Sequence, residues 1–233
     1  MTDNCSLTMA GAITALVAQK RNPDRVNVYL DGEFAFGLAM IEAIKLKRGQ
    51  VLSDADIARL SNADEVAKAH ERALRFLGNR PRSEREVRQN LAKGEVSLSA
   101  TDEVVERLSN VGLIDDAAFV KYWLDNLAQF SPRSERALRQ ELLRKGVDRD
   151  VIDAVLGETA HDEDRAAIQA ALAKADRYRQ LPRAEFAQKL GAYLGRRGFG
   201  YETIREAVAA VWQSIHAEDE DSSSSDRFDE TEE

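Results

Sequence analysis

Arginine recurs on one side of two short helices that the sequence predicts in the middle of the chain. The two sets lie 51 residues apart and consist of Arg82, Arg85, Arg88, Arg133, Arg136 and Arg139. Residues three or four apart share a helix face, so each set would point away from the apolar side. A guanidinium binds phosphate or carboxylate oxygens through two parallel hydrogen bonds. Because a cation at a helix start gains nothing from the helix dipole, Arg82 and Arg133 favour an external anionic partner.

A solvated helix face with local ion pairs is the alternative interpretation of these arginines. Glu86 and Glu141 lie within helical reach of them, and exposed pairs of this kind are common and weak. A third segment has Ala184 and Ala187 at the corresponding positions, so the three segments need not do the same work. Its positive charge lies instead at Lys189, Arg196 and Arg197.

The sequence offers no constellation of catalytic or metal-binding residues. The histidines His70, His161 and His216 are scattered, and Cys5 is the single cysteine. The chain also lacks a glycine-rich phosphate loop, a paired-cysteine metal motif and a nucleophile elbow. We therefore expect a binding protein with no catalytic residue, no metal and no cofactor.

The arginines belong to a pattern of about 50 residues that occurs three times. In each copy a proline precedes a helix with two apolar residues, and a basic residue followed by glycine ends that helix. The prolines and the basic–glycine pairs are Pro81, Pro132, Pro182, Lys93-Gly94, Lys145-Gly146 and Arg197-Gly198. Proline ends the incoming helix, and glycine supplies the left-handed stop. Ser83 and Glu86 have the spacing of a capping box. Such units are too small to fold alone, so the pattern predicts stacked repeats of three helices each.

Apolar residues predict which face of each helix is buried. The opening helices are expected at Glu65–Leu77, Asp116–Leu127 and roughly Asp162–Tyr178. The inward residues of the second helices are Val87, Leu91, Leu138, Leu142, Phe186 and Leu190. Those of the third helices are Val104, Val105, Leu108, Val151, Ile152, Val155, Ile204, Val208 and Val211. The third copy is four residues longer between its leucine and its glycine, which is about one helical turn.

The N-terminal part has the alternation of β-strands. Ile13–Gln19, Val26–Leu30 and Glu33–Gly37 are the expected strands of a three-stranded antiparallel meander. Asp31-Gly32 separates the last two and is the strongest short signal for a hairpin. A short helix is expected at Ser53–Leu60, with Ser53 or Asp54 as its cap.

These patterns predict a mainly α protein with a small N-terminal β-meander. The expected parts are 1–62 (meander and short helix), 63–114, 115–160 and 161–216 (the three repeats) and 217–233 (a disordered acidic tail). The net charge of -8 comes from the tail, because the preceding residues carry equal numbers of acidic and basic side chains. The tail is expected to solubilise the chain or to compete for its basic surface. No apolar run is long enough to span a membrane, and the single cysteine suits a reducing cytoplasm.

Four ordered blocks of the sequence resemble the RecX family, bacterial proteins that regulate the recombinase RecA. The resemblance runs from about Ile13 to Trp212. The blocks are Arg80-Pro81-Arg82-Ser83-Glu84 with Leu91 and Lys93-Gly94, Gly112-Leu113-Ile114-Asp115-Asp116 with Phe119, Ser134 through Leu142 with Lys145-Gly146, and Arg196-Arg197-Gly198-Phe199 with Tyr201 and Ile204. The N-terminal hairpin is similar to an extension on longer members.

The resemblance implies a bent array of nine helices, in three helix-turn-helix-like repeats, that binds the RecA filament on single-stranded DNA. Such proteins lower the ATPase, strand-exchange and co-protease activities of RecA in the SOS response and in DNA repair by homologous recombination, although some act in either direction. The implied contact candidates are Arg82, Arg85, Arg88, Arg133, Arg136, Arg139, Lys145, Arg196 and Arg197. The neutral fold and acidic tail favour recognition of RecA and DNA together over tight binding of DNA alone. We expect a cytoplasmic monomer.

Two other classes of function stay open at this point. Three-helix modules of this size also read duplex DNA in transcriptional regulators, and such a reader would prefer a specific duplex site. Helical arrays also serve as scaffolds that bind only proteins, in which case loss of the arginines would leave function intact.

Overall fold

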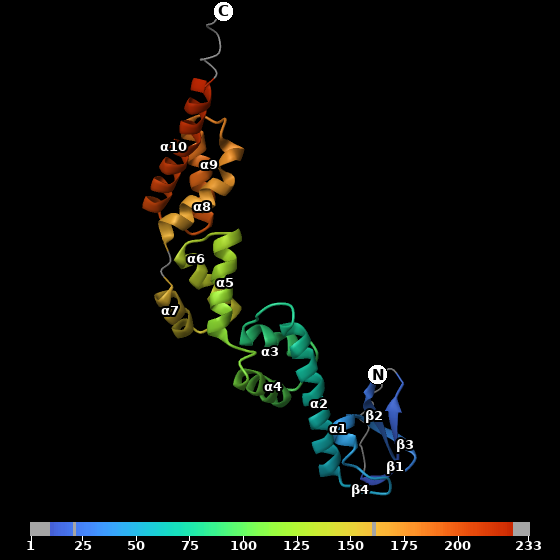
Figure 1. Ribbon diagram of the computed structural model, residues 1–233. Helices are drawn as coiled ribbons and strands as arrows, with labels where there is room; N and C mark the ends of the chain where they lie inside the picture. The colour runs from blue at the N-terminus through green and yellow to red at the C-terminus, as the bar shows by residue number, and fades with distance from the viewer. Residues whose placement is uncertain (1–9, 21, 160–161, 226–233) are drawn as a thin grey trace, which may run out of the picture. The chain divides into compact units, whose positions relative to one another are not determined.

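The computed structural model describes residues 10–20, 22–159 and 162–225, and side chains as far as residue 217. The chain forms two compact units (Figure 1). One consists of Met1–Arg82 with Glu86–Ile114, and the other of Ser83–Arg85 with Asp115–Glu233.

The first unit begins with a four-stranded antiparallel sheet. Its strands are β1 (Gly11–Gln19), β2 (Asn22–Leu30), β3 (Glu33–Ala39) and β4 (Val51–Leu52), in the order β3-β2-β1-β4. Asp31 and Gly32 both have positive φ, 49° and 94°, as a two-residue hairpin turn requires, so the predicted hairpin is confirmed. The predicted three-stranded antiparallel meander is confirmed as β1-β2-β3, and the sheet has a fourth strand that was not predicted. β4 has only two residues, too few to show alternation, and it pairs with the start of β1.

Helix α2 (Asp54–Leu77) links this sheet to the first repeat. Ser53 caps it and forms a capping box with Asp56, which confirms the predicted cap. The expected helix end at Leu60 was wrong, because α2 continues without interruption. Its buried residues are apolar apart from Asp64, which pairs with Arg25. Ile57 and Leu60 pack on the sheet, while Val66 packs in the first repeat. With no proline or glycine between Leu60 and Val66, nothing breaks the helix there.

The first repeat consists of the second half of α2 with α3 (Glu84–Ala92) and α4 (Leu98–Asn110). Its core includes the predicted inward residues Val87, Leu91, Val104, Val105 and Leu108. The left-handed residue after α3 is Glu95 (φ 58°), rather than the predicted Gly94. Gly94 is instead a close-approach position, since a Cβ there would lie 2.8 Å from the guanidinium of Arg72.

The second unit contains the other two repeats. The second repeat consists of α5 (Asp116–Phe130), α6 (Glu135–Lys145) and α7 (Arg149–Glu158). The third consists of α8 (Glu163–Ala175) with the 3-10 turn η1 (Asp176–Tyr178), α9 (Arg183–Arg196) and α10 (Tyr201–Ser225), orange to red in Figure 1. Gly146 and Gly198 adopt positive φ at the ends of α6 and α9, as predicted. In the residues described, the three repeats therefore contain nine α-helices, α2 to α10.

The C-terminal segment differs from the expectation of a tail without structure from residue 217. Helix α10 continues to Ser225, because the segment after Ile215 contains no proline or glycine to end it. The last part of the expected tail, residues 226–233, lies outside the described residues.

The recurring serine and glycine motifs join successive repeats within the second unit. The buried Ser134 donates its N–H to the carbonyl oxygen of Arg197 (3.2 Å), and Glu135 N–H bonds to the Glu163 carboxylate (3.3 Å). The same unit contains an equivalent set of contacts at its Ser83–Arg85 segment. There the buried Ser83 hydroxyl donates to the Lys145 carbonyl (2.7 Å), and Glu84 N–H bonds to Asp116 (2.9 Å). Within this unit, each serine segment therefore binds a basic–glycine segment that comes later in the chain.

Candidate interface on the second and third helices

The groove between the second and third helices of the second repeat holds a small basic pocket. Its volume is about 240 Å³. It is lined from α6 by Arg136, Arg139, Gln140 and Leu143, and from α7 by Arg149, Ile152 and Asp153. Arg136 and Arg139 are adjacent on one face of α6, one helical turn apart, as the sequence predicted.

Carboxylates fix the central arginine of this pocket. Arg139 donates to the Glu135 carboxylate from Nε (3.0 Å) and from Nη2 (2.7 Å), and it also pairs with Asp153. Its guanidinium is therefore oriented and partly neutralised. Arg136 and Arg149 are exposed and make no hydrogen bond or ion pair with any residue that the structure describes. Their positive charges are available to an external anion. This pocket is therefore the most suitable place for an anion near the predicted arginines.

The first repeat has a related arrangement with less positive charge. Arg88 pairs with Asp102 (2.5 Å). The two residues are fourteen positions apart in the sequence, the same spacing as between Arg139 and Asp153. The position that corresponds to Arg149 is occupied by Leu98, which is 82% exposed. Arg85 lies within the second unit, where its exposed side chain passes so close to Gly146 that a Cβ there would overlap it. The two repeats therefore share a framework but differ in surface charge.

Three of the candidate residues contact other parts of the fold. The Arg82 guanidinium lies 4.1 Å from the centre of the Phe76 ring. Arg133 pairs with Glu141 (3.0 Å), so the local ion pair considered from the sequence is present. Lys145 Nζ lies 4.6 Å from a tryptophan ring, that of Trp123. These interactions hold the side chains in place, and an external contact through them would compete with the fold.

The two arginines at the end of α9 differ sharply in their surroundings. Arg197 donates to the Ser131 hydroxyl (2.9 Å) and to the Pro132 carbonyl (2.8 Å), and its guanidinium stacks on Tyr193 (4.7 Å). It therefore fastens the third repeat to the second. Arg196 is exposed and has no hydrogen bond or ion pair to a described residue, which leaves it available for an external contact.

Reasoning from the sequence missed Arg149, although it sits in the pocket with Arg136. The residue opens the third helix directly after its cap, Asp148, so helix order could have pointed to it. The pairing of α6 with α7 was needed to show that it lies beside the other arginines.

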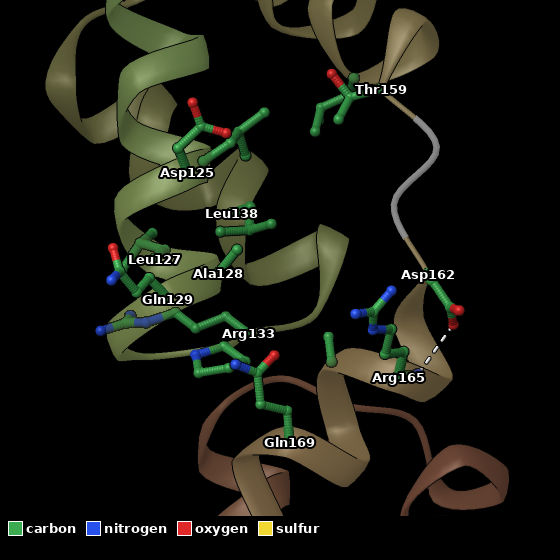
Figure 2. A pocket seen from close by; sticks show the side chains of 14 residues that line it. Asp125, Leu127, Ala128, Gln129, Arg133, Leu138, Thr159, Asp162, Arg165 and Gln169 are labelled. Atoms are coloured by element: carbon green, nitrogen blue, oxygen red, sulfur yellow. Dashed lines mark hydrogen bonds between the residues drawn. The ribbon is translucent and has the colours of Figure 1, made fainter.

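A larger cavity of about 460 Å³ lies within the second unit, between the second repeat and α8. Figure 2 shows Arg133 and Arg165 on opposite sides of this space, with Leu138 above Arg133 in this view. Asp162 accepts a hydrogen bond from the backbone N–H of Arg165 (2.9 Å) and caps α8. The lining mixes aliphatic residues with scattered polar ones, and it contains no convergent set of groups that could carry out a reaction.

Metal binding, membrane spanning and one buried carboxylate can be assessed for the residues that the structure describes. The described residues contain no group of three His, Cys, Asp or Glu side chains that could hold a metal ion. No described helix is both long and apolar enough to cross a membrane. Partial burial raises the pKa of Asp116, and the N–H of Glu84 offsets part of that effect. Within the second unit, this carboxylate contacts the Ser83–Arg85 segment and does not line the basic pocket.

The architecture defines a class of protein: tandem three-helix units, helix-turn-helix-like, with a basic groove and a small N-terminal sheet. Comparison with known proteins identifies the family. Residues 11–53 match the regulatory protein RecX N-terminal domain, and residues 69–108, 115–156 and 162–208 match the first, second and third three-helix domains of RecX. The chain belongs to the RecX family of regulatory proteins.

Individual relatives agree with this assignment. The chain is 32% identical over 212 residues to the regulatory protein RecX of Bacillus subtilis, covering 90% of this chain and 79% of the relative. It is 34% identical over 202 residues to that of Levilactobacillus brevis, covering 85% and 76%. A crystal structure of a regulatory protein RecX superposes with a TM-score of 0.64 at 28% identity, covering 88% of this chain and 99% of that one.

Proposed function

We propose that this protein modulates the RecA recombinase, in the inhibitory direction, by binding the RecA filament on single-stranded DNA. Binding lowers the ATPase, strand-exchange and co-protease activities of the filament. The protein acts as a cytoplasmic monomer without a cofactor. Membership of the RecX family supports a regulatory role related to RecA, and the basic groove supports contact with an anionic partner.

The observation that carries the proposal is the pocket between α6 and α7. Arg136 and Arg149 reach it from two helices, have no partner among the described residues and flank an arginine that carboxylates orient. Two guanidinium groups near a third suit a phosphate of single-stranded DNA held by the filament. Because residues 1–217 have equal numbers of acidic and basic side chains, attraction to DNA is local. Weak binding to DNA alone is therefore expected, with tighter binding to the filament.

The test is DNA-dependent ATP hydrolysis by the cognate RecA on single-stranded DNA, titrated with this protein. Wild-type protein is expected to suppress hydrolysis at less than one molecule per RecA. The Arg136→Ala, Arg149→Ala double variant needs a concentration roughly tenfold or more higher for half-maximal suppression. Arg59→Ala with Arg107→Ala is the matched control, since both are exposed arginines outside the groove. An unchanged ATPase rate at an excess of wild-type protein would contradict the proposal.

A second candidate is a helix-turn-helix-like regulator that reads duplex DNA. It is favoured by the short connection between α6 and α7 and by arginines on both helices. A sequence-specific reader would bind a selected duplex roughly a thousandfold more tightly than random duplex. Selection from a random duplex library distinguishes the two, because a filament regulator enriches no sequence.

A further inference from the structure

We propose that the groove between α9 and α10 of the third repeat binds an apolar side chain of a partner protein. On the partner, this side chain is flanked by carboxylates. The inference rests on the proposed function, since the partner it assigns to this groove is the recombinase. It divides the work between two repeats: the second takes an anion, and the third takes a protein side chain.

The groove occupies the same place in the third repeat as the basic pocket in the second. Its volume is about 480 Å³, roughly twice that of the basic pocket. Ala187, Gln188 and Gly191 of α9 take the positions of Arg139, Gln140 and Leu143 of α6. Tyr201, Ile204 and Arg205 of α10 take those of Arg149, Ile152 and Asp153 of α7. Equivalent surfaces of the two repeats therefore differ in chemistry, one basic and narrow, the other apolar and wide.

Small residues on α9 keep this groove open. Glycine is the poorest helix former after proline, so Gly191 in the middle of α9 destabilises the helix. Packing does not require it, because a Cβ at Gly191 would lie 3.5 Å from Ile204 Cγ2, an ordinary van der Waals contact. That added methyl group would enter the groove. The presence of glycine at position 191 is therefore better explained by the open groove that it leaves than by a requirement of helix packing.

The walls of the groove suit an aliphatic or aromatic side chain rather than a nucleobase. Ile204, Val208 and Trp212 line it. Trp212 is already fixed edge-on against Phe186 (5.0 Å) and stacked on His216 (3.8 Å), which leaves less of its ring to stack on a base. Sequence-specific base recognition needs hydrogen-bonding groups at the base edges, and the middle of this groove is aliphatic. Apolar grooves between helices commonly receive apolar residues of a partner protein.

Charge determines what surrounds that side chain. Arg183 and Arg205 line the groove, and Arg205 also pairs with Glu202. Residues 162–216 contain nine basic and seven acidic side chains, whereas residues 115–160 contain seven and nine. The third repeat is thus the positive one of the two. Carboxylates next to the entering side chain would meet these arginines, so the preferred partner segment is apolar at its centre and acidic at its flanks.

The first part of the test compares Gly191→Leu with Gly195→Leu. Both place leucine on α9, but Gly191 lines the groove and Gly195 does not. A Cβ would make only ordinary contacts at both positions, 3.9 Å from Ile204 Cδ1 at Gly195, and leucine is a better helix former than glycine, so both variants are expected to keep the helix. In the RecA ATPase titration, Gly191→Leu raises the half-maximal concentration roughly tenfold or more, and Gly195→Leu leaves it close to wild type. Binding of single-stranded DNA by the protein alone is unchanged in both. Equal behaviour of the two variants, or a parallel loss of DNA binding in Gly191→Leu, would overturn the inference.

The second part identifies the occupant directly. A photoreactive phenylalanine analogue replaces Tyr201, which is 81% exposed at the groove, and the protein is irradiated with RecA on single-stranded DNA. Mass spectrometry is expected to find a RecA peptide with an apolar residue beside Asp or Glu. Cross-links to DNA only, to the same chain or to a second copy overturn the inference, as does their absence. A RecA cross-link without ATPase suppression would contradict the proposed inhibition and keep the groove assignment. Suppression without a RecA cross-link would support the proposed inhibition and overturn the groove assignment.

Discussion

Ser134 and Arg197 meet where the second repeat joins the third, through the hydrogen bond from the Ser134 N–H to the Arg197 carbonyl (3.2 Å). Both residues belong to motifs that recur along the chain, the serine that follows proline and the basic residue that precedes glycine. The same serine also accepts the N–H of Ala137 through its side chain and caps α6 (3.2 Å). One buried residue therefore starts a helix and binds the next repeat, which explains why the two motifs recur together.

Gly198→Ala is expected to destabilise this junction. Gly198 has φ +91°, and a Cβ there would lie 2.5 Å from Ser134 Oγ and 2.8 Å from Ala137 Cβ. Backbone strain and overlap together should lower the free energy of unfolding by more than about 1 kcal/mol. Urea unfolding followed by circular dichroism measures this. Gly157→Ala is the control, because this position within α7 has open space around it and should gain about 0.5–1 kcal/mol. A Gly198→Ala variant as stable as wild type would refute the close contact.

Leu142→Ala is expected to lower the stability of the second repeat by roughly 2–5 kcal/mol. Leu142 is fully buried among Phe119, Val147 and Ile152, so alanine would leave a cavity. Its neighbour Leu143 is 38% exposed, and Leu143→Ala should cost markedly less. The urea midpoints of the two variants give the comparison. If they coincide, the register of α6 is wrong.

Much of the fold could be predicted from the sequence because it follows from local patterns. The apolar spacing located the inward residues of the second helices, including Leu142, and the glycines marked the ends of α6 and α9. The two-residue strand β4 could not be predicted, since its pairing with β1 is a tertiary contact. The unbroken helix α2 was missed because a change of buried partner, from the sheet to the first repeat, looks in sequence like a boundary.

The candidate site was less predictable than the fold. Spacing could place Arg136 and Arg139 on one helix face, but it gave no information on which carboxylates they would meet. Asp153 comes from another helix, and Arg149 becomes part of the pocket only when α7 packs on α6. The apolar groove in the third repeat was hidden for a similar reason, because alanine and glycine on α9 reveal a space only once α10 lies opposite.

Arg197→Ala and Arg196→Ala separate a structural role from a contact role. Arg197 loses two hydrogen bonds to the loop before α6 and its stacking on Tyr193, so the variant should be less stable by about 1–3 kcal/mol. Arg196 has no hydrogen bond or ion pair among the described residues, and its removal should change stability by less than about 0.5 kcal/mol. Differential scanning calorimetry of the two variants tests this. In the RecA ATPase assay Arg196→Ala should nevertheless weaken suppression if it is a contact. Equal melting temperatures of the Arg197→Ala and Arg196→Ala variants would contradict the structural role of Arg197.

Asp116→Asn is expected to change how stability depends on pH. Partial burial raises the pKa of Asp116 above its ordinary value of 3.8, so the folded state holds this proton more tightly than the unfolded state. The stabilisation that protonation gives is fully present below that ordinary value and is lost as pH rises through the raised pKa. At neutral pH the ionised carboxylate carries the cost of burial, which asparagine does not, while the asparagine side-chain oxygen can still accept the N–H of Glu84. The variant should therefore be at least as stable as wild type at pH 7, and its advantage should shrink as the pH falls to the ordinary value. Urea unfolding of both proteins over this pH range measures the difference in their free energies of unfolding. The contributions of all other titrating groups cancel in this difference. A difference that stays constant with pH would show that Asp116 titrates alike in the folded and unfolded states.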